Sequence, residues 1–308
     1  MKGSEHFLVP EQPYADYRAY LAAVGSSAVA AARERAPADI LRALAESGLR
    51  GRGGAGFSAG TKWQSLANHP ADTKYVVMNA AEGEPGTFKD RYLLRKNPYA
   101  AIEGMLIGAH VIGARAGFIA AKASFQRELG RLRAALAEME AVLDGFEITV
   151  VEGPEEYLFG EEKALLNVIE GEGPLPRPPE YPPFEVGLFA KPGKPNPALV
   201  NNVETYARVS TIVRHGAASF RAIGSGDTAG PILFTLTGDV TRPGVYELPA
   251  GITLRWLGPC REWIRGRCRT GPPLKRERSR RHRAIMAASP PGMLLMVIFL
   301  PSVIPVTP

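Results

Sequence analysis

A glycine-rich stretch at 49–63, LRGRGGAGFSAGTKW, is the first segment whose composition points to chemistry. Its backbone N–H groups could wrap a phosphate, and Lys62 could add a point charge. Neither common phosphate loop fits. A P-loop requires Ser or Thr after the lysine, where Trp63 stands, and a Rossmann loop follows a strand, whereas this loop follows a predicted helix. Taken by itself, the stretch could also be a plain surface turn.

The segment 79–90, NAAEGEPGTFKD, follows a predicted strand directly. Ligands bind at the carboxyl ends of strands in open α/β sheets, so polar side chains could meet a ligand here. Asn79 could hydrogen-bond ring heteroatoms, while Glu82 and Glu84 could hold hydroxyl groups. The alternative is a solvated acidic turn.

Two further polar stretches, 157–166 and 200–205, each precede or begin a predicted helix. The first, YLFGEEKALL, places Glu161 and Glu162 in a first helical turn, where the helix dipole alone would favour carboxylates. The second, VNNVET, contains two asparagines that could simply cap the helix that follows.

Apolar periodicity indicates the elements that would position these stretches. Alternating strands and helices predict an α/β domain with a parallel sheet and crossover helices. Predicted helices lie at 38–48, 98–113, 125–144 and 203–215, and predicted strands at 75–79, 117–121 and 146–151. The proline-rich segment 171–197 predicts a long ordered loop or lid. Strands at 232–237 and 244–248 predict a β-hairpin that opens a second, β-rich unit.

The charge of the chain is unevenly distributed. Residues 258–308 contain 10 of the 37 Lys and Arg but 2 of the 31 Asp and Glu, so the net charge of +6 arises there. Both cysteines, Cys260 and Cys268, lie in the same segment, which leaves residues 1–257 without a disulfide or a thiolate metal site. Its arginine cluster could bind nucleic acid or an anionic membrane, but no aromatic residues are interleaved with it. We therefore expect a disordered, out-of-frame extension and no nucleic-acid partner.

The sequence shows no targeting signal and no predicted membrane span. Its N-terminus lacks the apolar run of a signal peptide. Its longest apolar run is broken by prolines and is shorter than the roughly 20 residues of a spanning helix. These features predict a cytoplasmic protein without a transmembrane segment.

The polar stretches occur in the order found in one known family. From about residue 49 to residue 249, the chain resembles the NADH-binding FMN flavoprotein of respiratory complex I, the 51 kDa family of NADH-quinone oxidoreductase. The same module serves as the diaphorase of NAD-linked hydrogenases and formate dehydrogenases. The resemblance is carried by RGRGGAGF with K-W, N-A-x-E-x-E-P-G-x-F-K-D-R, Y-x-x-G-E-E-x-A-L, G-L-x-x-K-P, N-N-V-E-T and G-D-V-T-R-P-G-V-Y-E-L-P. It implies that the glycine loop approaches FMN, and NADH lying over it, at distances that a side chain would prevent.

The resemblance implies a set of site residues. For FMN, the implied residues are Gly51, Arg52, Gly53, Gly54, Lys62, Asn79, Glu82, Tyr157, Gly160, Glu161, Val200, Asn201, Asn202 and Thr205. For NADH, they are Phe57, Glu84, Glu162 and Phe184, with the aromatic rings flanking the adenine. No general acid or base is expected, because hydride passes directly from nicotinamide to flavin, with Glu84 and Glu162 nearest. These two carboxylates near the ribose should favour NADH over NADPH.

The sequence also departs from the family pattern. Ala81 stands where an aspartate is common, Phe159 where a cysteine is common and Ser65 where an aromatic residue is frequent, so we expect a divergent paralogue. The family continues into a helical bundle whose four cysteines bind a [4Fe–4S] cluster, whereas two cysteines cannot supply that ligation. We therefore expect a chain truncated before its iron–sulfur cluster.

The resemblance also predicts the domain organisation, the partners and two alternatives. The expected units are an N-terminal helical segment (1–48), an FMN/NADH-binding α/β domain (49–225), an incomplete ubiquitin-like, β-grasp unit of the soluble-ligand-binding type (226–257) and a disordered tail (258–308). A thioredoxin-like 2Fe–2S subunit and other electron-transfer subunits are the implied partners, at the inner face of the cell membrane. A non-catalytic fragment or assembly partner, and an FMN diaphorase that reduces a soluble acceptor, stay open.

Overall fold

The structure is a computed structural model that describes residues 6–178, 181–225, 228–238, 243–251 and 297–300. Its helices are α1 (Tyr17–Val24), α2 (Ala28–Arg33), α3 (Pro37–Ser47), α4 (Ala59–Asn68), α5 (Lys89–Lys96), α6 (Pro98–Ile112), α7 (Gln126–Glu138), α8 (Glu140–Leu143), the 3-10 helix η2 (Tyr157–Gly160), α9 (Glu162–Ile169), α10 (Val203–His215) and α11 (Ala217–Arg221). Its strands are β1 (Tyr75–Asn79), β2 (Ala116–Lys122), β3 (Ile148–Gly153), β4 (Ala198–Asn202), β5 (Gly224–Ser225), β6 (Thr228–Ala229), β7 (Pro231–Gly238), β8 (Gly244–Pro249) and β9 (Val297–Leu300).

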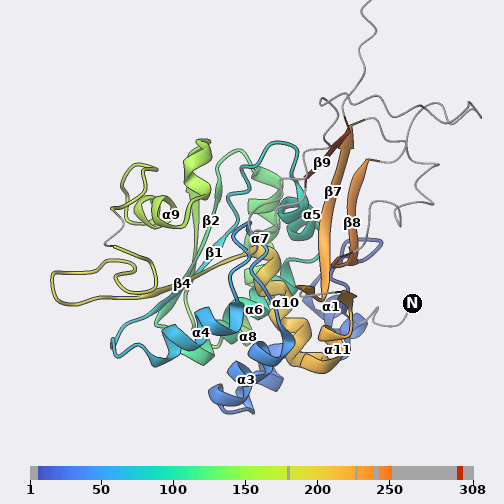
Figure 1. Cartoon of the computed structure of the whole chain (residues 1–308), viewed down its shortest axis with the longest axis horizontal. Coiled ribbons are helices and arrows are strands. Elements are labelled where there is room, and N and C mark those ends of the chain that lie inside the picture. Colours follow the sequence, from blue (N-terminus) through green and yellow to red (C-terminus); the bar gives the residue numbers. More distant parts are fainter. Residues whose placement is uncertain (1–5, 179–180, 226–227, 239–242, 252–296, 301–308) are drawn as a thin grey trace, which may run out of the picture.

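Four parallel strands form the central sheet in the order β3-β2-β1-β4. Val76, Val77 and Met78 of β1 are all fully buried, as expected for a strand whose sheet is covered on both faces. Figure 1 shows α9 on one side of this sheet and α6, α7 and α10 on the other. The predicted parallel α/β sheet is confirmed.

The two faces of the sheet bury separate apolar clusters. Val77 packs with Leu165 and Leu166 of α9 in the smaller cluster. The larger cluster lies on the other face and includes residues of α6 and α10. These two helices pack closely, since a Cβ on Gly104 would lie 1.8 Å from the carbonyl oxygen of Tyr206. This packing fixes the start of α10 and, with it, the end of β4.

Local differences from the predicted elements have local causes. The predicted helix at 125–144 is divided into α7 and α8 at Met139, whose N–H is shared between the carbonyl oxygens of Ala135 and Leu136. Helix α4, which the apolar pattern does not predict, begins after the glycine loop, where Ser58 accepts a hydrogen bond from Thr61 N. Helix α5 is likewise absent from the predicted elements.

The second unit contains the predicted hairpin strands. Strands β7 and β8 pair antiparallel, and the connection at 239–242 lies outside the described residues. Strand β9 pairs parallel with β7 on its other side. Our prediction of a disordered tail at 258–308 is therefore wrong for Val297–Leu300, because the apolar and β-branched sequence of these residues suits a strand and β7 offers an open edge. The rest of that segment lies outside the described residues.

A buried carboxylate joins the β-rich unit to the α/β body. Glu247 of β8 forms an ion pair with Arg208 of α10. The same carboxylate accepts hydrogen bonds from the backbone N–H groups of Leu8 (2.8 Å) and Val9 (3.0 Å). The hairpin, α10 and the N-terminal segment are thus held at one point.

Candidate functional site

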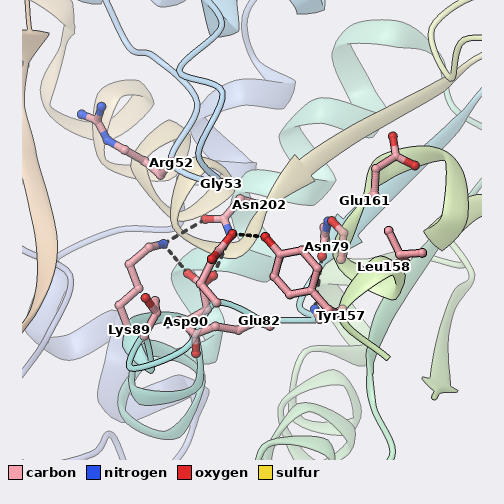
Figure 2. Close-up of a pocket in the computed structure, with 15 residues that line it drawn as sticks. Arg52, Gly53, Asn79, Glu82, Lys89, Asp90, Tyr157, Leu158, Glu161 and Asn202 are labelled. Atoms are coloured by element: carbon pink, nitrogen blue, oxygen red, sulfur yellow. Dashed lines mark hydrogen bonds and ion pairs between the residues drawn. The ribbon is translucent and has the colours of Figure 1, made fainter. Parts of the chain in front are cut away.

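A cavity of about 320 Å³ opens at the carboxyl edge of the parallel sheet, within the usual volume range of small-molecule sites. Asn79 ends β1 and Asn202 ends the adjacent strand β4, so both side chains reach the same edge. Figure 2 shows these side chains with those of the surrounding segments. The lining residues are Arg52, Gly53, Asn79, Ala81, Glu82, Gly83, Glu84, Thr87, Lys89, Asp90, Tyr157, Leu158, Gly160, Glu161 and Asn202.

The glycine loop connects α3 to α4 and is closed by a backbone hydrogen bond. Gly51 N donates to Phe57 O at 2.8 Å. Gly54 and Gly56 have φ values of 125° and 62°, which side-chain-bearing residues rarely adopt. The loop therefore needs glycine for its own conformation, and its position between two helices agrees with the exclusion of a Rossmann loop.

The loop also approaches the end of β4 closely. A Cβ on Gly53 would lie 3.2 Å from the Cβ of Asn202, tighter than most van der Waals contacts. Arg52 N donates to the hydroxyl of Thr205 at 2.9 Å. The Arg52 guanidinium turns away from the cavity and donates to Ala229 O at 2.9 Å (Figure 2). Arg52 thus lines the cavity near its backbone, while its charge lies toward the second unit.

Hydrogen bonds order the wall formed by the segment after β1. Asn79 Nδ2 donates to Gly160 O at 2.8 Å and so links β1 to η2. The buried carboxylate of Glu82 accepts from Asp90 N (3.0 Å) and from Arg91 Nε (3.2 Å). Burial, followed by the nearby charge of Asp90, raises the pKa of Glu82 to about 7. This carboxyl therefore titrates near neutral pH.

A buried charge cluster lies at the boundary between the cavity and α10 (Figure 2). Lys89 Nζ lies 2.7 Å from an Asp90 carboxylate oxygen and 3.1 Å from a Glu204 carboxylate oxygen. It also donates to Asn202 Oδ1 at 3.3 Å. Burial opposes the charge of Lys89, but the neighbouring carboxylates outweigh it and raise the pKa of the ammonium. Lys89 is therefore a buried cation at the cavity.

The segment around η2 forms the opposite wall. The Tyr157 hydroxyl donates to the Glu84 carboxylate, and this bond raises the pKa of the tyrosine. Glu161 caps α9 by accepting from the N–H groups of Lys163 (2.9 Å) and Ala164 (3.0 Å). Glu162 lies in the first turn of α9, where the helix dipole favours a carboxylate, and Glu161 both caps the helix and lines the cavity.

The structure brings half of the predicted site residues into the cavity wall. Those that line it are Arg52, Gly53, Asn79, Glu82, Glu84, Tyr157, Gly160, Glu161 and Asn202. Those that do not are Gly51, Gly54, Phe57, Lys62, Glu162, Phe184, Val200, Asn201 and Thr205.

The residues outside the wall have other neighbours. Lys62 Nζ forms an ion pair with Glu162 at 2.6 Å. The buried Asn201 amide, oriented with its oxygen toward Trp63, accepts from the indole Nε1 at 2.9 Å. Phe57 and Phe184 are exposed. The roles implied for these residues stay predictions.

Six further residues of the wall are not among the predicted site residues. They are Ala81, Gly83, Thr87, Lys89, Asp90 and Leu158. Lys89 and Asp90 stand within the motif N-A-x-E-x-E-P-G-x-F-K-D-R, so the sequence does carry a signal for them. A buried Lys–Asp pair next to a predicted ligand segment could have been proposed from that motif.

The family description that matches the chain is the Nuo51 FMN-binding domain, over residues 44–211. The chain belongs to this family. It is 38% identical over 262 residues to the F 2 subunit of NADH-quinone oxidoreductase from Rhizobium meliloti (strain 1021), an alignment that covers 82% of this chain and 59% of that protein. It is 41% identical over 231 residues to the NAD-reducing hydrogenase HoxS subunit alpha of Cupriavidus necator, covering 71% of this chain and 37% of the relative. The predicted family is thus confirmed.

A solved structure supports the same relationship. A chain of the NAD⁺-reducing [NiFe]-hydrogenase in the H₂-reduced state superimposes with a TM-score of 0.68 at 38% identity, covering 76% of this chain and 41% of that one. The present chain therefore spans about two fifths to three fifths of the relatives that share its fold and sequence. No helix in the described part of the chain is long and apolar enough to cross a membrane. No three His, Cys, Asp or Glu side chains among the described residues are grouped to hold a metal ion.

Proposed function

We propose that this chain binds FMN and NADH at the cavity described above and accepts electrons from NADH. FMN, when bound, supplies the chemistry by accepting a hydride from the nicotinamide. The main support is that the glycine loop, the ends of β1 and β4, and η2 all line one cavity. The chain that forms this cavity belongs to the Nuo51 FMN-binding domain family.

The residues present suit a flavin nucleotide. The glycine loop presents backbone at its closest approach to β4, where a side chain on Gly53 would crowd Asn202 in the cavity wall. The Thr87 hydroxyl lines the cavity, is buried and has no hydrogen-bond partner among the described residues. Lys89 brings a cation to a wall that also carries Glu82, Glu84 and Asp90. A bound ligand could satisfy the hydroxyl, and the cation could offset its negative charge.

The chain itself would bind and orient the reactants. Holding the nicotinamide against the flavin in one geometry removes much of the entropic barrier to hydride transfer. Glu84 faces the cavity, where its carboxylate would accept from a ribose hydroxyl and repel a 2′-phosphate, so we propose NADH rather than NADPH as the donor. Phe57 and Phe184, both exposed, would be available to flank the adenine.

The acceptor side of the reaction is also a proposal. By analogy with relatives that are named as subunits, we propose that electrons leave toward a thioredoxin-like 2Fe–2S subunit in a larger assembly, held peripherally at the inner face of the cell membrane. Cys260 and Cys268 are the two cysteines of this sequence, fewer than the four ligands of a [4Fe–4S] cluster, so we propose no iron–sulfur route within this chain.

The test is flavin content and its response to NADH. Purified protein should take up about one FMN per chain, and NADH added without oxygen should bleach the flavin absorbance more than NADPH does. Gly53→Leu should abolish FMN uptake because the new side chain meets Asn202, while Gly130→Leu, at an exposed helix position with open space beside it, should retain it. Wild-type protein that takes up no flavin contradicts the proposal. Flavin that binds but is not reduced by NADH would indicate the non-catalytic alternative.

A further inference from the structure

We infer that Lys89 and Asp90 form a clamp that positions the Asn202 amide at the cofactor cavity and keeps one cation in its wall. The inference rests on the proposed function, because it assigns these residues to the FMN site. All three line the cavity. The side chains of Lys89 and Asp90 are 10% and 5% exposed.

The geometry fixes the orientation of the Asn202 amide. Its oxygen accepts from Lys89 Nζ at 3.3 Å, and its nitrogen donates to the second carboxylate oxygen of Asp90 at 2.6 Å. A reversed amide would place NH₂ against the ammonium and C=O against the carboxylate. Both contacts would be repulsive, so Lys89 and Asp90 together select one orientation. In that orientation one Nδ2 hydrogen has no acceptor in the described part of the chain and is available to a ligand.

The same amide also caps α10. Asn202 Oδ1 accepts from Glu204 N at 3.0 Å, at the start of the helix that follows β4. The clamp therefore acts on a side chain that is held by the backbone as well. Small errors in its position are costly where a ligand must be held within fractions of an ångström.

The location of Lys89 argues against a purely structural role. Lys89 is the first residue of α5, where the helix dipole disfavours a cation, and it is also buried. Three acceptors, from Asp90, Glu204 and Asn202, surround its ammonium and offset these costs. A cation that is both buried and at a helix N-terminus is locally unfavourable, and such a residue beside a cavity is typical of a functional site.

The charges around the clamp are nearly balanced. Glu204, which faces Lys89, is shared with the buried Arg208 at 3.0 Å. Asp90 is shared with Asn202, and Glu82 faces the other side of the segment, paired with Arg91. Removing one of these charged groups therefore changes the net charge at the cavity by one elementary charge, and the direction in which the electrostatic potential shifts is known. This gives a readout that a structural role would not produce.

The experiment compares Lys89→Met and Asp90→Asn with the wild type, with Lys96→Met as the matched control at the other end of α5. Three quantities are measured: the Kd for FMN by titration of the apoprotein, the reduction potential of the bound flavin, and the free energy of unfolding without flavin. Lys89→Met should weaken FMN binding about tenfold or more, as expected for loss of a hydrogen-bonded charge. Lys96→Met should leave the Kd within about twofold.

The reduction potential separates the clamp from simple destabilisation. Lys89→Met removes a cation and should lower the potential, while Asp90→Asn removes an anion and should raise it. Lys89→Arg should restore most of the FMN affinity because it keeps the charge. Unchanged FMN affinity in Lys89→Met, or equal shifts of the same sign in both variants, would overturn the clamp while leaving the proposed function intact. Wild-type protein that binds no FMN would overturn both.

Discussion

Glu82 is the residue whose pH dependence the structure predicts most directly. Its carboxyl is buried in the cavity wall, and burial, followed by the charge of Asp90, raises its pKa from 4.5 to about 7. Because the folded state holds the proton more tightly than the unfolded chain, this group stabilises the fold fully below the unfolded pKa. That contribution is lost as the pH rises toward the folded pKa. The difference between a pKa of 4.5 in the unfolded chain and about 7 in the folded protein corresponds to about 3 kcal/mol of folding free energy.

Replacement of Glu82 by glutamine isolates this contribution. Glutamine cannot ionise, so the variant should gain stability over the wild type as the pH rises from about 5 to about 8, by about 2.5 kcal/mol. The ion pair with Arg91 acts on the ionised carboxyl and is already part of the folded-state pKa, so it does not alter this expected change with pH. A difference in packing between the two side chains would add an offset that is the same at every pH. Urea unfolding at several pH values, each compared with the wild type, measures the difference. Glu140→Gln, at an exposed position, serves as the control for replacing a carboxylate.

The protonation of Glu82 should also affect the binding of a ligand at the cavity. Since a protonated Glu82 carries no charge, the affinity for an anionic flavin nucleotide should rise as the pH falls from about 8 to about 6, and Glu82→Gln should flatten this dependence. A difference in unfolding free energy between wild type and Glu82→Gln that stays constant from acid to neutral pH would refute the reasoning. It would mean that the hydrogen bonds from Asp90 N and Arg91 keep the carboxylate ionised despite its burial.

Two further predictions concern the packing and the mouth of the cavity. Gly104→Ala should destabilise the protein by about 2–4 kcal/mol in urea unfolding, because its Cβ would meet the Tyr206 carbonyl oxygen at 1.8 Å. The exposed Gly130→Ala should not destabilise it, and equal stabilities of the two variants would contradict the close α6–α10 contact. Tyr157→Phe should lower the KM for NADH about two- to fivefold without changing kcat, since NADH no longer competes with the tyrosine hydroxyl for Glu84. A higher KM would show that the hydroxyl itself contacts the dinucleotide.

Periodicity is sufficient to predict the sheet but not every element beside the cavity. Strand β1 is predictable because its apolar run is buried on both faces. Helix α5 is not, since five of the eight residues in its sequence KDRYLLRK are charged and its two leucines are adjacent, which gives little apolar period. Its first residues are buried through ion pairs rather than through apolar packing, which a hydrophobic pattern cannot detect.

Strand alternation explains why only one asparagine of the predicted pair lines the cavity. The resemblance of the motif implies an FMN-binding role for both Asn201 and Asn202. Successive residues of a strand, however, point to opposite faces of the sheet. Asn202 faces the cavity with Lys89 and Asp90, and Asn201 faces the larger apolar cluster, where it contacts Trp63. Alternation along β4 is therefore enough to separate the two roles from sequence.

Buried ion pairs connect the α/β domain to the β-rich unit across their predicted boundary. Lys89 at the cavity contacts Glu204, Glu204 contacts Arg208, and Arg208 contacts Glu247 of β8. The side chains of Glu204 and Arg208 are fully buried, so each depends on its partners for compensation. A fragment that ended at residue 225 would lose Glu247 and leave Arg208 with a single carboxylate. Removing one partner from a buried network of charges is destabilising. We therefore expect the hairpin to help hold α10 and the cavity wall in place.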